Sequence, residues 1–486
     1  MVLIARCQEA GGLRSRMLAL RHAVNALSPK SQKSMTPSLS KESTVASGSN
    51  STSPESQSEE GCEQQGSPFG VGGAGTVKCK GELDTRGGQL GSDDDIEDEG
   101  HSSFHKPAVT SYMKPGSARR SFDISDDEEW STSGGSDGDA EEARVRELQE
   151  DIERASKKLC SLQPWSSTSF SYCRRLQDAA RNQGRVDLFK CLDSGDFVAV
   201  KRMPTTWVTS CHEEFVKMYP RSSEQPWVDL GILAYLNELC YPYVMQLWGV
   251  YEDSDTTCVV TSLATEGDLF SWCDKLQEPG LERENVVHNI ARQILTATVW
   301  LHDLGIAHRD LSLENILLTE HEGYLSARLI DFGMASLDRV GVGRYGKVSY
   351  QAPEMHLSRS AEYDLFLADA FSLGVVLFAL TAADYPWLGT APNKCQLFNY
   401  ASTCGFRAYT TRRKLRKNPR YVLADVFSEP LLDLLEGLLA LRPEGRLTLG
   451  ERCWVEAEEG GGTRPSVWDM AWLDPHAAKT RPLASL

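Results

Sequence analysis

The side chains of this chain best suited to chemistry are a lysine, two aspartates and an asparagine. Asp310 and Asn315 share the motif HRDLSLEN, and Asp331 lies in the motif LIDFG. Asparagine and aspartate oxygens are hard ligands that suit Mg²⁺, which keeps its remaining positions for phosphate oxygens and water. Lys201 ends an apolar run, but a lone lysine at a strand end is ordinarily solvated and is a weak signal by itself. These groups come from separate parts of the chain, so only the fold can bring them together.

Several elements must position these groups. Residues 197–201 have the apolar character of a buried strand, and a second apolar strand, 316–318, directly follows HRDLSLEN. Five signatures occur in order along the chain: HRDLSLEN at 308–315, LIDFG at 329–333, APE at 352–354, DAFSLG at 369–374 and RPEGR at 442–446. Chance does not produce five such signatures at these spacings.

This ordered set resembles the catalytic domain of eukaryotic protein kinases, and its motif variants resemble those of divergent protist kinases. The resemblance implies an α+β fold of two lobes, a β-rich N-lobe to about residue 263 and an α-helical C-lobe from about residue 264. It implies transfer of the ATP γ-phosphate to a hydroxyl of a protein substrate, with ATP and Mg²⁺ as cofactors. We expect a Ser/Thr kinase, although the catalytic loop matches neither the Ser/Thr nor the Tyr pattern. The alternative is a pseudokinase that acts as a nucleotide-binding or empty scaffold.

The resemblance assigns a role to each polar group. Lys201 would hold the α- and β-phosphates, and Asp310 would orient the substrate hydroxyl and accept its proton. Asn315 and Asp331 would bind Mg²⁺. Other residues implied to line the nucleotide site are Gly184 and Val186 in the phosphate loop, Ala199 and Leu317 around adenine, Thr261 behind it, Leu263 in the hinge and Asp268 near the ribose or the peptide.

Supporting contacts are implied as well. His308 and Phe332 would belong to an apolar stack that links the lobes. Asp369 would hold the backbone of the catalytic loop from below. Glu354 and Arg446 would form a buried ion pair in the C-lobe.

The loop expected to hold the phosphates departs from the family pattern. Where that pattern has three glycines and a valine, this chain has Ala179, Arg181, Gly184 and Val186. Glycines let a backbone approach phosphate closely, so their loss predicts weak or altered ATP binding. Arg181 could contact phosphate itself or point into solvent, and the sequence leaves both possibilities open.

The acid expected to pair with Lys201 is also displaced. In the helix predicted at 227–239, counting back from Pro242 by the usual spacing leads to Ile232, which cannot pair with a lysine. One turn earlier stands Asp229, and the positions one, four and seven residues after it are apolar, as a buried helix face requires. We therefore predict that Asp229 pairs with Lys201.

Two residue types near Asp310 are exchanged relative to Ser/Thr kinases. Ser312 stands where those kinases have a lysine, and Lys347 stands where they have a threonine. Because the two side chains meet at the catalytic aspartate in the family, we expect Lys347 to supply the cation and Ser312 the hydroxyl of one network. Two unrelated losses in a decaying pseudokinase are the alternative.

Composition divides the chain near residue 160. Residues 1–138 form an acidic, Ser-rich arm that is poor in aromatic and β-branched residues, and we predict that it is disordered. An amphipathic helix is predicted at 139–163, packed on a kinase-like domain at 164–456. The chain has 51 Lys and Arg against 68 Asp and Glu, a net charge of −17, which argues against nucleic-acid binding. Because no apolar run approaches about 18 residues, no transmembrane span is expected.

The two ends of the chain leave alternatives open. Residues 1–30 combine arginines with apolar residues, a pattern typical of an organelle transit peptide or a membrane-surface helix; a disordered basic end is the alternative. We otherwise expect a cytoplasmic protein, and no motif indicates its oligomeric state. The acidic serine segments 92–95 and 121–129 could make the arm a phosphorylated docking platform. The tail at 457–486 is expected to dock on the domain through Trp468 and Trp472.

Overall fold

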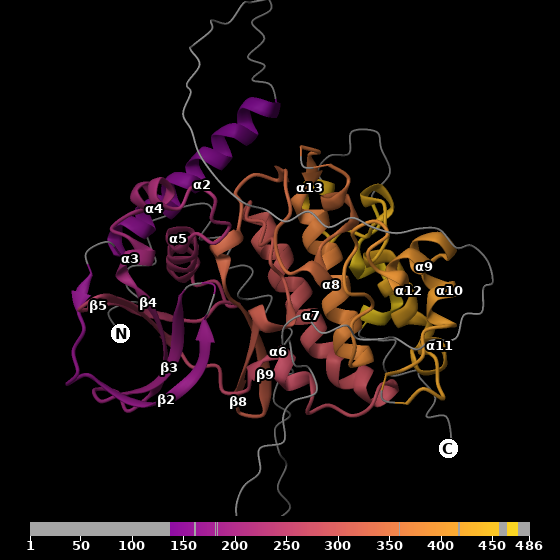
Figure 1. The fold of residues 1–486 in the computed structure, drawn as a ribbon, viewed down its shortest axis with the longest axis horizontal. Coiled ribbons are helices and arrows are strands. Elements are labelled where there is room, and N and C mark those ends of the chain that lie inside the picture. Colours follow the sequence, from indigo (N-terminus) through magenta and orange to yellow (C-terminus); the bar gives the residue numbers. More distant parts are fainter. Residues whose placement is uncertain are drawn as a thin grey trace, which may run out of the picture. The chain divides into compact units, whose positions relative to one another are not determined.

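The structure is a computed structural model, and it describes residues 137–159, 162–179, 181, 183–358, 360–416, 418–455 and 464–474. Apart from its last two positions, the predicted disordered arm lies outside the described residues, together with its basic end and its acidic serine segments. The described chain forms a β-rich N-lobe (163–262) and a helical C-lobe (267–474), as Figure 1 shows. The predicted α+β fold of two lobes is confirmed.

A six-stranded sheet with the strand order β1-β5-β6-β4-β3-β2 forms the N-lobe. The strands are β1 (Gln163–Pro164), β2 (Phe170–Ala179), β3 (Gly184–Cys191), β4 (Phe197–Pro204), β5 (Leu247–Asp253) and β6 (Thr256–Ser262). Neighbouring strands are antiparallel, except that β1 and β5 are parallel. Side chains alternate across a strand, so Val198 and Val200 of β4 are buried in the core of this lobe while Ala199 and Lys201 point to the other face.

Three helices connect β4 to β5: α3 (Thr205–Val208), α4 (His212–Met218) and α5 (Pro226–Glu238). Helix α5 corresponds to the helix predicted at 227–239. It begins at Pro226, in the first turn, where a helix does not use the N–H that proline lacks. Ile232 is fully buried in the apolar core, so the helix presents a different residue to Lys201.

Helix α2 (Asp137–Leu159) packs against α5 (Figure 1). It was predicted at 139–163 and ends earlier, because the chain continues into strand β1. Leu148, Ile152 and Ala155 form its buried face. The two helices approach closely at Gly231 of α5, where a Cβ atom would lie 3.0 Å from Cγ2 of Ile152. A glycine is needed at this crossing because any side chain would push α2 away.

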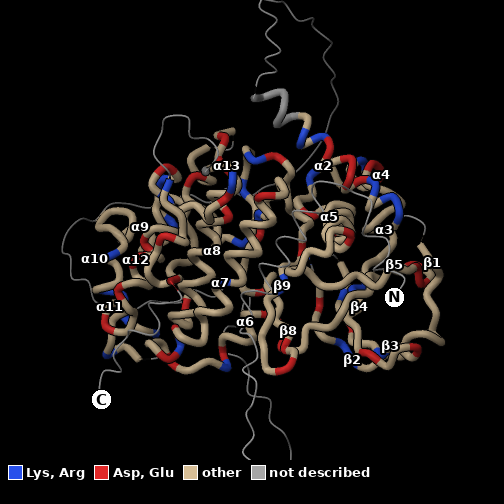
Figure 2. The backbone as a smooth tube through the Cα atoms, turned by 180° about the vertical axis from the view of Figure 1, so that it is seen from behind, with Lys and Arg blue, Asp and Glu red and all other residues tan. Residues whose placement is uncertain are grey.

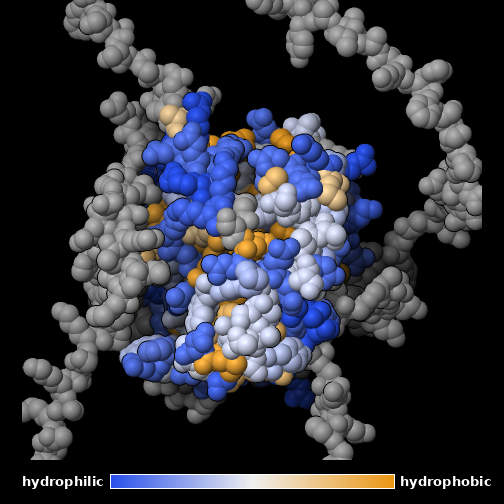
Figure 3. Space-filling view, turned by 90° about the vertical axis from the view of Figure 1, so that its left-hand side faces the viewer, coloured by the Kyte–Doolittle hydropathy of each residue, from blue (hydrophilic) through white to orange (hydrophobic). Residues whose placement is uncertain are grey.

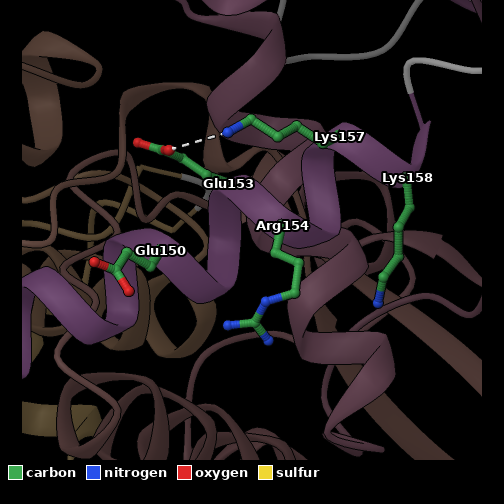
Figure 4. A pocket seen from close by; sticks show the side chains of 5 residues that line it. All are labelled: Glu150, Glu153, Arg154, Lys157 and Lys158. Atoms are coloured by element: carbon green, nitrogen blue, oxygen red, sulfur yellow. Dashed lines mark ion pairs between the residues drawn. The ribbon is translucent and has the colours of Figure 1, made fainter.

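The outer face of α2 is polar. Figure 4 shows Glu150, Glu153, Arg154, Lys157 and Lys158 along this face. Lys157 lies 3.7 Å from Glu153 one turn earlier, and Lys158 pairs with Glu238 of α5 at 2.6 Å. Acidic and basic residues are interspersed along α2 in Figure 2, and Figure 3 shows that this side of the N-lobe is largely hydrophilic.

The C-lobe is mainly helical. Its helices are α6 (Leu269–Cys273), α7 (Leu281–Asp303), α8 (Leu365–Ala382), α9 (Gln396–Cys404), α10 (Phe406–Thr410), α11 (Leu423–Val426), α12 (Glu429–Leu438) and α13 (Arg452–Val455). A small sheet of β7 (Gly267–Asp268), β8 (Ile316–His321) and β9 (Tyr324–Leu329) lies next to the predicted nucleotide site. A further pair, β10 (Val340–Gly341) and β11 (Tyr363–Asp364), joins the segment after LIDFG to the start of α8.

Helix α8 has 18 mostly apolar residues and is longer than any continuous apolar run in the sequence. Among the described residues it is the one helix whose length and composition would allow it to cross a membrane. All of its residues are nevertheless buried inside the protein, because α8 is the core helix of the C-lobe. Burial therefore explains its composition.

Part of the predicted tail is described, and it lies along α7. Trp472 is buried, and its Nε1 donates a hydrogen bond to Oε2 of Glu284 at 3.2 Å. Trp468 lies beside the guanidinium of Arg292, 5.5 Å from ring centre to Cζ. The expected docking through tryptophans is therefore seen for residues 464–474, while 457–463 and 475–486 lie outside the described residues.

Candidate active site

The catalytic-loop motif is held by helix α8. One carboxylate oxygen of Asp369 accepts the backbone N–H of His308 at 2.7 Å, and the other accepts that of Arg309 at 2.9 Å. Arg309 adopts a left-handed φ of 66°, which is costly for a residue with a side chain and persists only where the surroundings impose it. The two contacts to Asp369 supply that restraint and place Asp310 at the site.

The side chain of Asp310 is almost completely buried and accepts several hydrogen bonds. Its Oδ2 accepts from Nδ2 of Asn315 at 2.9 Å, and its Oδ1 accepts from the backbone N–H of Lys347 at 3.1 Å. The same amide nitrogen of Asn315 donates to the carbonyl of Asp310 at 2.8 Å. The structure therefore brings Asp310 and Asn315 into direct contact and orients the carboxylate.

Lys201 and Asp229 form the ion pair that the helix pattern predicted. Nζ of Lys201 lies 3.0 Å from Oδ2 of Asp229, and Oδ1 of the same aspartate accepts the backbone N–H of Phe332 at 2.9 Å. Burial acts to lower the pKa of Lys201, but the negative charges of Asp229 and Asp331 outweigh it, so the pKa is raised and the lysine stays charged. One carboxylate thus connects β4, α5 and the LIDFG segment.

Asp331 has the features of a ligand for a hard cation. Its backbone is left-handed, with a φ of 67°, and its buried Oδ1 atom has no hydrogen-bond partner. Burial raises the pKa of Asp331, against the opposing charge of Lys201. The described residues contain no cluster of three or more His, Cys, Asp or Glu that would enclose a metal. A carboxylate oxygen without a protein partner fits Mg²⁺, which takes one or two carboxylates and completes its shell with phosphate oxygens and water.

The sheets bring the remaining predicted nucleotide-site residues together in register. In the N-lobe, Ala199 lies opposite Thr261, and Val186 lies opposite Lys201. Leu263 directly follows β6, at the connection between the lobes. In the small C-lobe sheet, the two predicted residues Asp268 and Leu317 are direct partners in the register. Asp268 also accepts the backbone N–H of Ser271 at 2.7 Å and so caps helix α6.

Gly184 has a structural reason to be glycine that the sequence did not show. It lies at the start of β3, and a Cβ atom there would come within 2.0 Å of the carbonyl oxygen of Arg202 on β4. The close approach of two strands therefore excludes every other residue type, whether or not phosphate binds nearby.

The guanidinium of Arg181 contacts two acids of the site, although the side chain as a whole is partly exposed. Its Nη1 donates to Oδ2 of Asp310 at 2.8 Å and to Oε1 of Glu224 at 3.1 Å. Burial and the charge of Asp331 raise the pKa of Glu224 to about 7, although the charge of Arg181 opposes this shift. Sequence reasoning missed Glu224, which precedes α5 without any motif spacing. An acid just before a helix start usually indicates only a favourable interaction with the helix dipole.

The exchanged residues Ser312 and Lys347 lie in contact. Nζ of Lys347 donates to Oγ of Ser312 at 2.5 Å and lies 3.4 Å from Oε2 of Glu314. Ser312 is fully buried. The structure therefore places the cation and the hydroxyl of the expected network next to each other, beside Asp310.

The arginine of the catalytic-loop motif is covered by an aromatic ring. The guanidinium of Arg309 lies 3.4 Å from the ring centre of Tyr345, the only hydroxyl-bearing residue between Leu337 and Val348. The Nε atom of Arg309 is buried and makes no hydrogen bond. A cation–π contact thus occupies the arginine that the family commonly uses to bind a phosphate on this loop.

The supporting contacts implied by the motifs are present. The rings of His308 and Phe332 lie 5.1 Å apart. Arg446 donates to both carboxylate oxygens of Glu354, at 2.6 and 2.9 Å, and this pair is buried. Two-point contacts of this kind fix the relative orientation of distant segments.

Comparison with known proteins agrees with this geometry. The model of the protein kinase domain matches residues 182–455. A testis-specific serine/threonine-protein kinase 5 of Mus musculus is 31% identical over 225 residues, which are 44% of this chain and 54% of that protein. The serine/threonine-protein kinase SIK2 of Gallus gallus is 28% identical over 285 residues, 57% of this chain and 32% of that protein. RAD53 of Saccharomyces cerevisiae, a serine/threonine-protein kinase, is 29% identical over 232 residues, 44% of this chain and 26% of that protein.

The chain spans about half of the first of these relatives and about a third or less of the others. The match to the domain model nevertheless covers more than half of this chain and includes Lys201 and the five ordered motifs from HRDLSLEN to RPEGR. The chain belongs to the protein kinase family.

Proposed function

We propose that the protein is an active Ser/Thr protein kinase that transfers the ATP γ-phosphate to a hydroxyl of a protein substrate. The contact from Lys201 through the Asp229 carboxylate to the backbone N–H of Phe332 carries this proposal. Kinase activity requires the pair between the strand lysine and the helix acid together with a correctly placed Asp-Phe-Gly segment. Here a single aspartate satisfies both requirements.

Each residue of the site has a separate role in phosphoryl transfer, a reaction that depends mainly on positioning and charge stabilisation. Asp310 is the group placed to orient the acceptor hydroxyl and take its proton. Lys201 would hold the α- and β-phosphates, and Asn315 and Asp331 would hold Mg²⁺. When bound, Mg²⁺ would neutralise negative charge on the phosphates. Lys347, held by Ser312, adds a cation beside Asp310.

Two arguments support Ser/Thr as the acceptor class. The relatives described above are named serine/threonine kinases. The contact between Lys347 and Ser312 also reproduces, with exchanged residue types, the lysine and hydroxyl pair of that class.

A pseudokinase is the second candidate, and Arg181 is the observation that favours it. Its guanidinium is bonded to Oδ2 of Asp310, the carboxylate that would accept the proton of a substrate hydroxyl. The phosphate loop also keeps only one of its three expected glycines. A scaffold that binds nucleotide without turnover would have this appearance.

Substitution of the two aspartates tests the proposed activity. Asp310→Asn should reduce phosphorylation of a peptide library by at least the ~10²–10⁴-fold attributed to general base catalysis. Asp331→Ala should abolish it, because the variant lacks a proposed Mg²⁺ ligand. Asp338→Asn, an exposed position on the following loop, is the matched control and should leave the rate unchanged. Equal phosphorylation by wild type and either site variant would overturn the assignment. Thermal stabilisation by Mg·ATP without any turnover would identify the pseudokinase.

A further inference from the structure

We propose that Arg181 is a movable phosphate ligand: it contacts Asp310 in this structure and binds the β- and γ-phosphates when ATP enters, with Glu224 as its positioning residue. This inference rests on the proposed kinase function and assigns a triphosphate-binding role to a residue that stands where the family has glycine. It starts from the position of Arg181 in the turn between β2 and β3, above the catalytic loop.

The burial of Asp310, Glu224 and Arg181 supports a specific contact among their side chains. The carboxylates of Asp310 and Glu224 are 2% and 9% exposed, whereas the side chain of Arg181 is 41% exposed. The head group of Arg181 therefore reaches from the surface to two buried acids. Ion pairs between fully exposed groups contribute little, but a carboxylate removed from water depends strongly on its partner.

Glu224 is itself held in place. A Cβ atom added to Gly333 would lie 2.8 Å from Oε2 of Glu224. The glycine of the Asp-Phe-Gly segment therefore leaves room for this carboxylate. The next residue, Gln225, donates its N–H to the carbonyl of Gly333 at 3.0 Å. Glu224 thus anchors Arg181 to the same segment that carries Asp331.

The contact with Asp310 opposes turnover. Oδ2 of Asp310 accepts from Asn315 and from Arg181, so Arg181 fills the remaining acceptor position of Oδ2, while Oδ1 accepts from Lys347. A guanidinium bonded to this carboxylate stabilises its charged form and makes it a weaker acceptor for a hydroxyl proton. Proton transfer is therefore favoured when Arg181 leaves Asp310, and an anion that binds Arg181 more strongly provides the driving force.

Phosphate is such an anion. A guanidinium presents several N–H groups in a planar fork that matches two phosphate oxygens, and both charge and geometry strengthen the contact. The lost glycines would otherwise have offered backbone N–H groups to the same oxygens. Arg181 therefore replaces backbone donors with a side-chain cation, while Glu224 keeps the guanidinium directed inward.

Nucleotide binding to the full chain, measured by calorimetry with Mg·ATP and with AMP, tests this role separately from turnover. Arg181→Ala should weaken Mg·ATP binding by ~10- to 100-fold, the range of a charge-assisted hydrogen bond. AMP binding should stay within about twofold, because AMP has no β- or γ-phosphate. Arg181→Gly should bind Mg·ATP better than Arg181→Ala, since glycine restores close backbone approach. Arg174→Ala on β2, an exposed arginine, is the control and should change neither affinity.

The role of Glu224 is tested by a double-mutant cycle. Glu224→Gln should weaken Mg·ATP binding less than Arg181→Ala does, and it should add nothing in the double variant. Unchanged Mg·ATP affinity in Arg181→Ala, or equal losses for ATP and AMP, would overturn this inference while leaving the proposed kinase function intact. A wild-type protein that binds no Mg·ATP would overturn both.

Discussion

At the scale of single residues, the site shows how the same network can be built with its residue types exchanged. A lysine near a catalytic aspartate is useful only if its ammonium reaches the transferred phosphate, and its long flexible stem permits approach from either side of the loop. Lys347 reaches Ser312 from the segment between the LIDFG and APE motifs, whereas the usual lysine would start from the catalytic loop. Geometry at the aspartate, and not position in the sequence, is what the chemistry requires.

Removal of Lys347 tests this exchange. Lys347→Ala should lower kcat by ~10²-fold or more, the range for loss of one preorganised transition-state donor. The double change Ser312→Lys with Lys347→Thr should recover part of the loss, because it restores the ordinary arrangement. Lys394→Ala, an exposed lysine of the C-lobe, serves as the control. Strictly additive losses in steady-state kinetics would show that the two positions act independently.

At the scale of elements, helix α2 supports the helix that carries Asp229. Its buried face packs on α5, Lys158 pairs with Glu238 at the end of α5, and Arg144 donates to the carbonyl of Asp303 in the C-lobe at 2.6 Å. Helix α2 therefore contacts both lobes. Since α5 must hold Asp229 against Lys201, we expect α2 to affect activity without touching substrate.

Truncation separates α2 from the arm before it. Deletion of residues 1–135 should leave the kinase rate and the cooperative unfolding transition largely intact, because the composition of this segment cannot form a core.

Ile152→Asp should lower the melting temperature and the kinase rate, since it places a charge where α2 closely approaches Gly231 of α5. Glu150→Ala, on the outer face shown in Figure 4, should be neutral. If Ile152→Asp matches wild type in both measurements, α2 has no supporting role.

At the scale of the whole molecule, a buried imidazole joins three segments of the C-lobe. Nε2 of His302 at the end of α7 lies 3.0 Å from Asp369 of α8, and Nδ1 lies 2.8 Å from Glu451 before α13. Burial acts to lower the pKa of His302, but the hydrogen bonds to the two acids outweigh it and raise the pKa to about 9. Because Asp369 also holds the catalytic loop, this charged group connects global stability to the site.

The raised pKa makes stability depend on pH in a definite direction. The folded protein keeps the proton of His302 up to about pH 9, whereas the unfolded chain releases it near pH 6.5. The stabilisation is therefore complete below about pH 6.5 and is lost as the pH rises toward 9. Urea unfolding of wild type should show a falling free energy of unfolding across this range.

His302→Gln provides the comparison for this pH dependence. The variant should be less stable at pH 6.5, and its free energy of unfolding should fall much less between pH 6.5 and 9. His321→Gln, at an exposed histidine of β8, should keep the wild-type slope. If the free energy of unfolding falls equally with pH in wild type and in His302→Gln, a group other than His302 causes the pH dependence.

The motifs and their order carried the resemblance to protein kinases, and that resemblance implied the α+β fold of two lobes. The pairing of Lys201 with Asp229 was predictable because a helix repeats its apolar positions, and the positions one, four and seven residues after Asp229 are apolar. Ile232 was excluded because its side chain cannot pair with a lysine, and the structure buries it fully in the core. The catalytic loop was predictable for a similar reason, since its polar residues lie within one short motif.

Other features depended on the tertiary structure. No spacing connects Arg181 to Asp310 or to Glu224, and none connects His302 to Glu451, because these partners are far apart in the chain and meet only when separate elements pack. The requirement for glycine at positions 184 and 231 likewise comes from neighbouring segments that approach within van der Waals contact. Sequence patterns report which face of an element is buried. Which distant charge or side chain lies against that face is decided by packing, since burial and electrostatic pairing are properties of the assembled core.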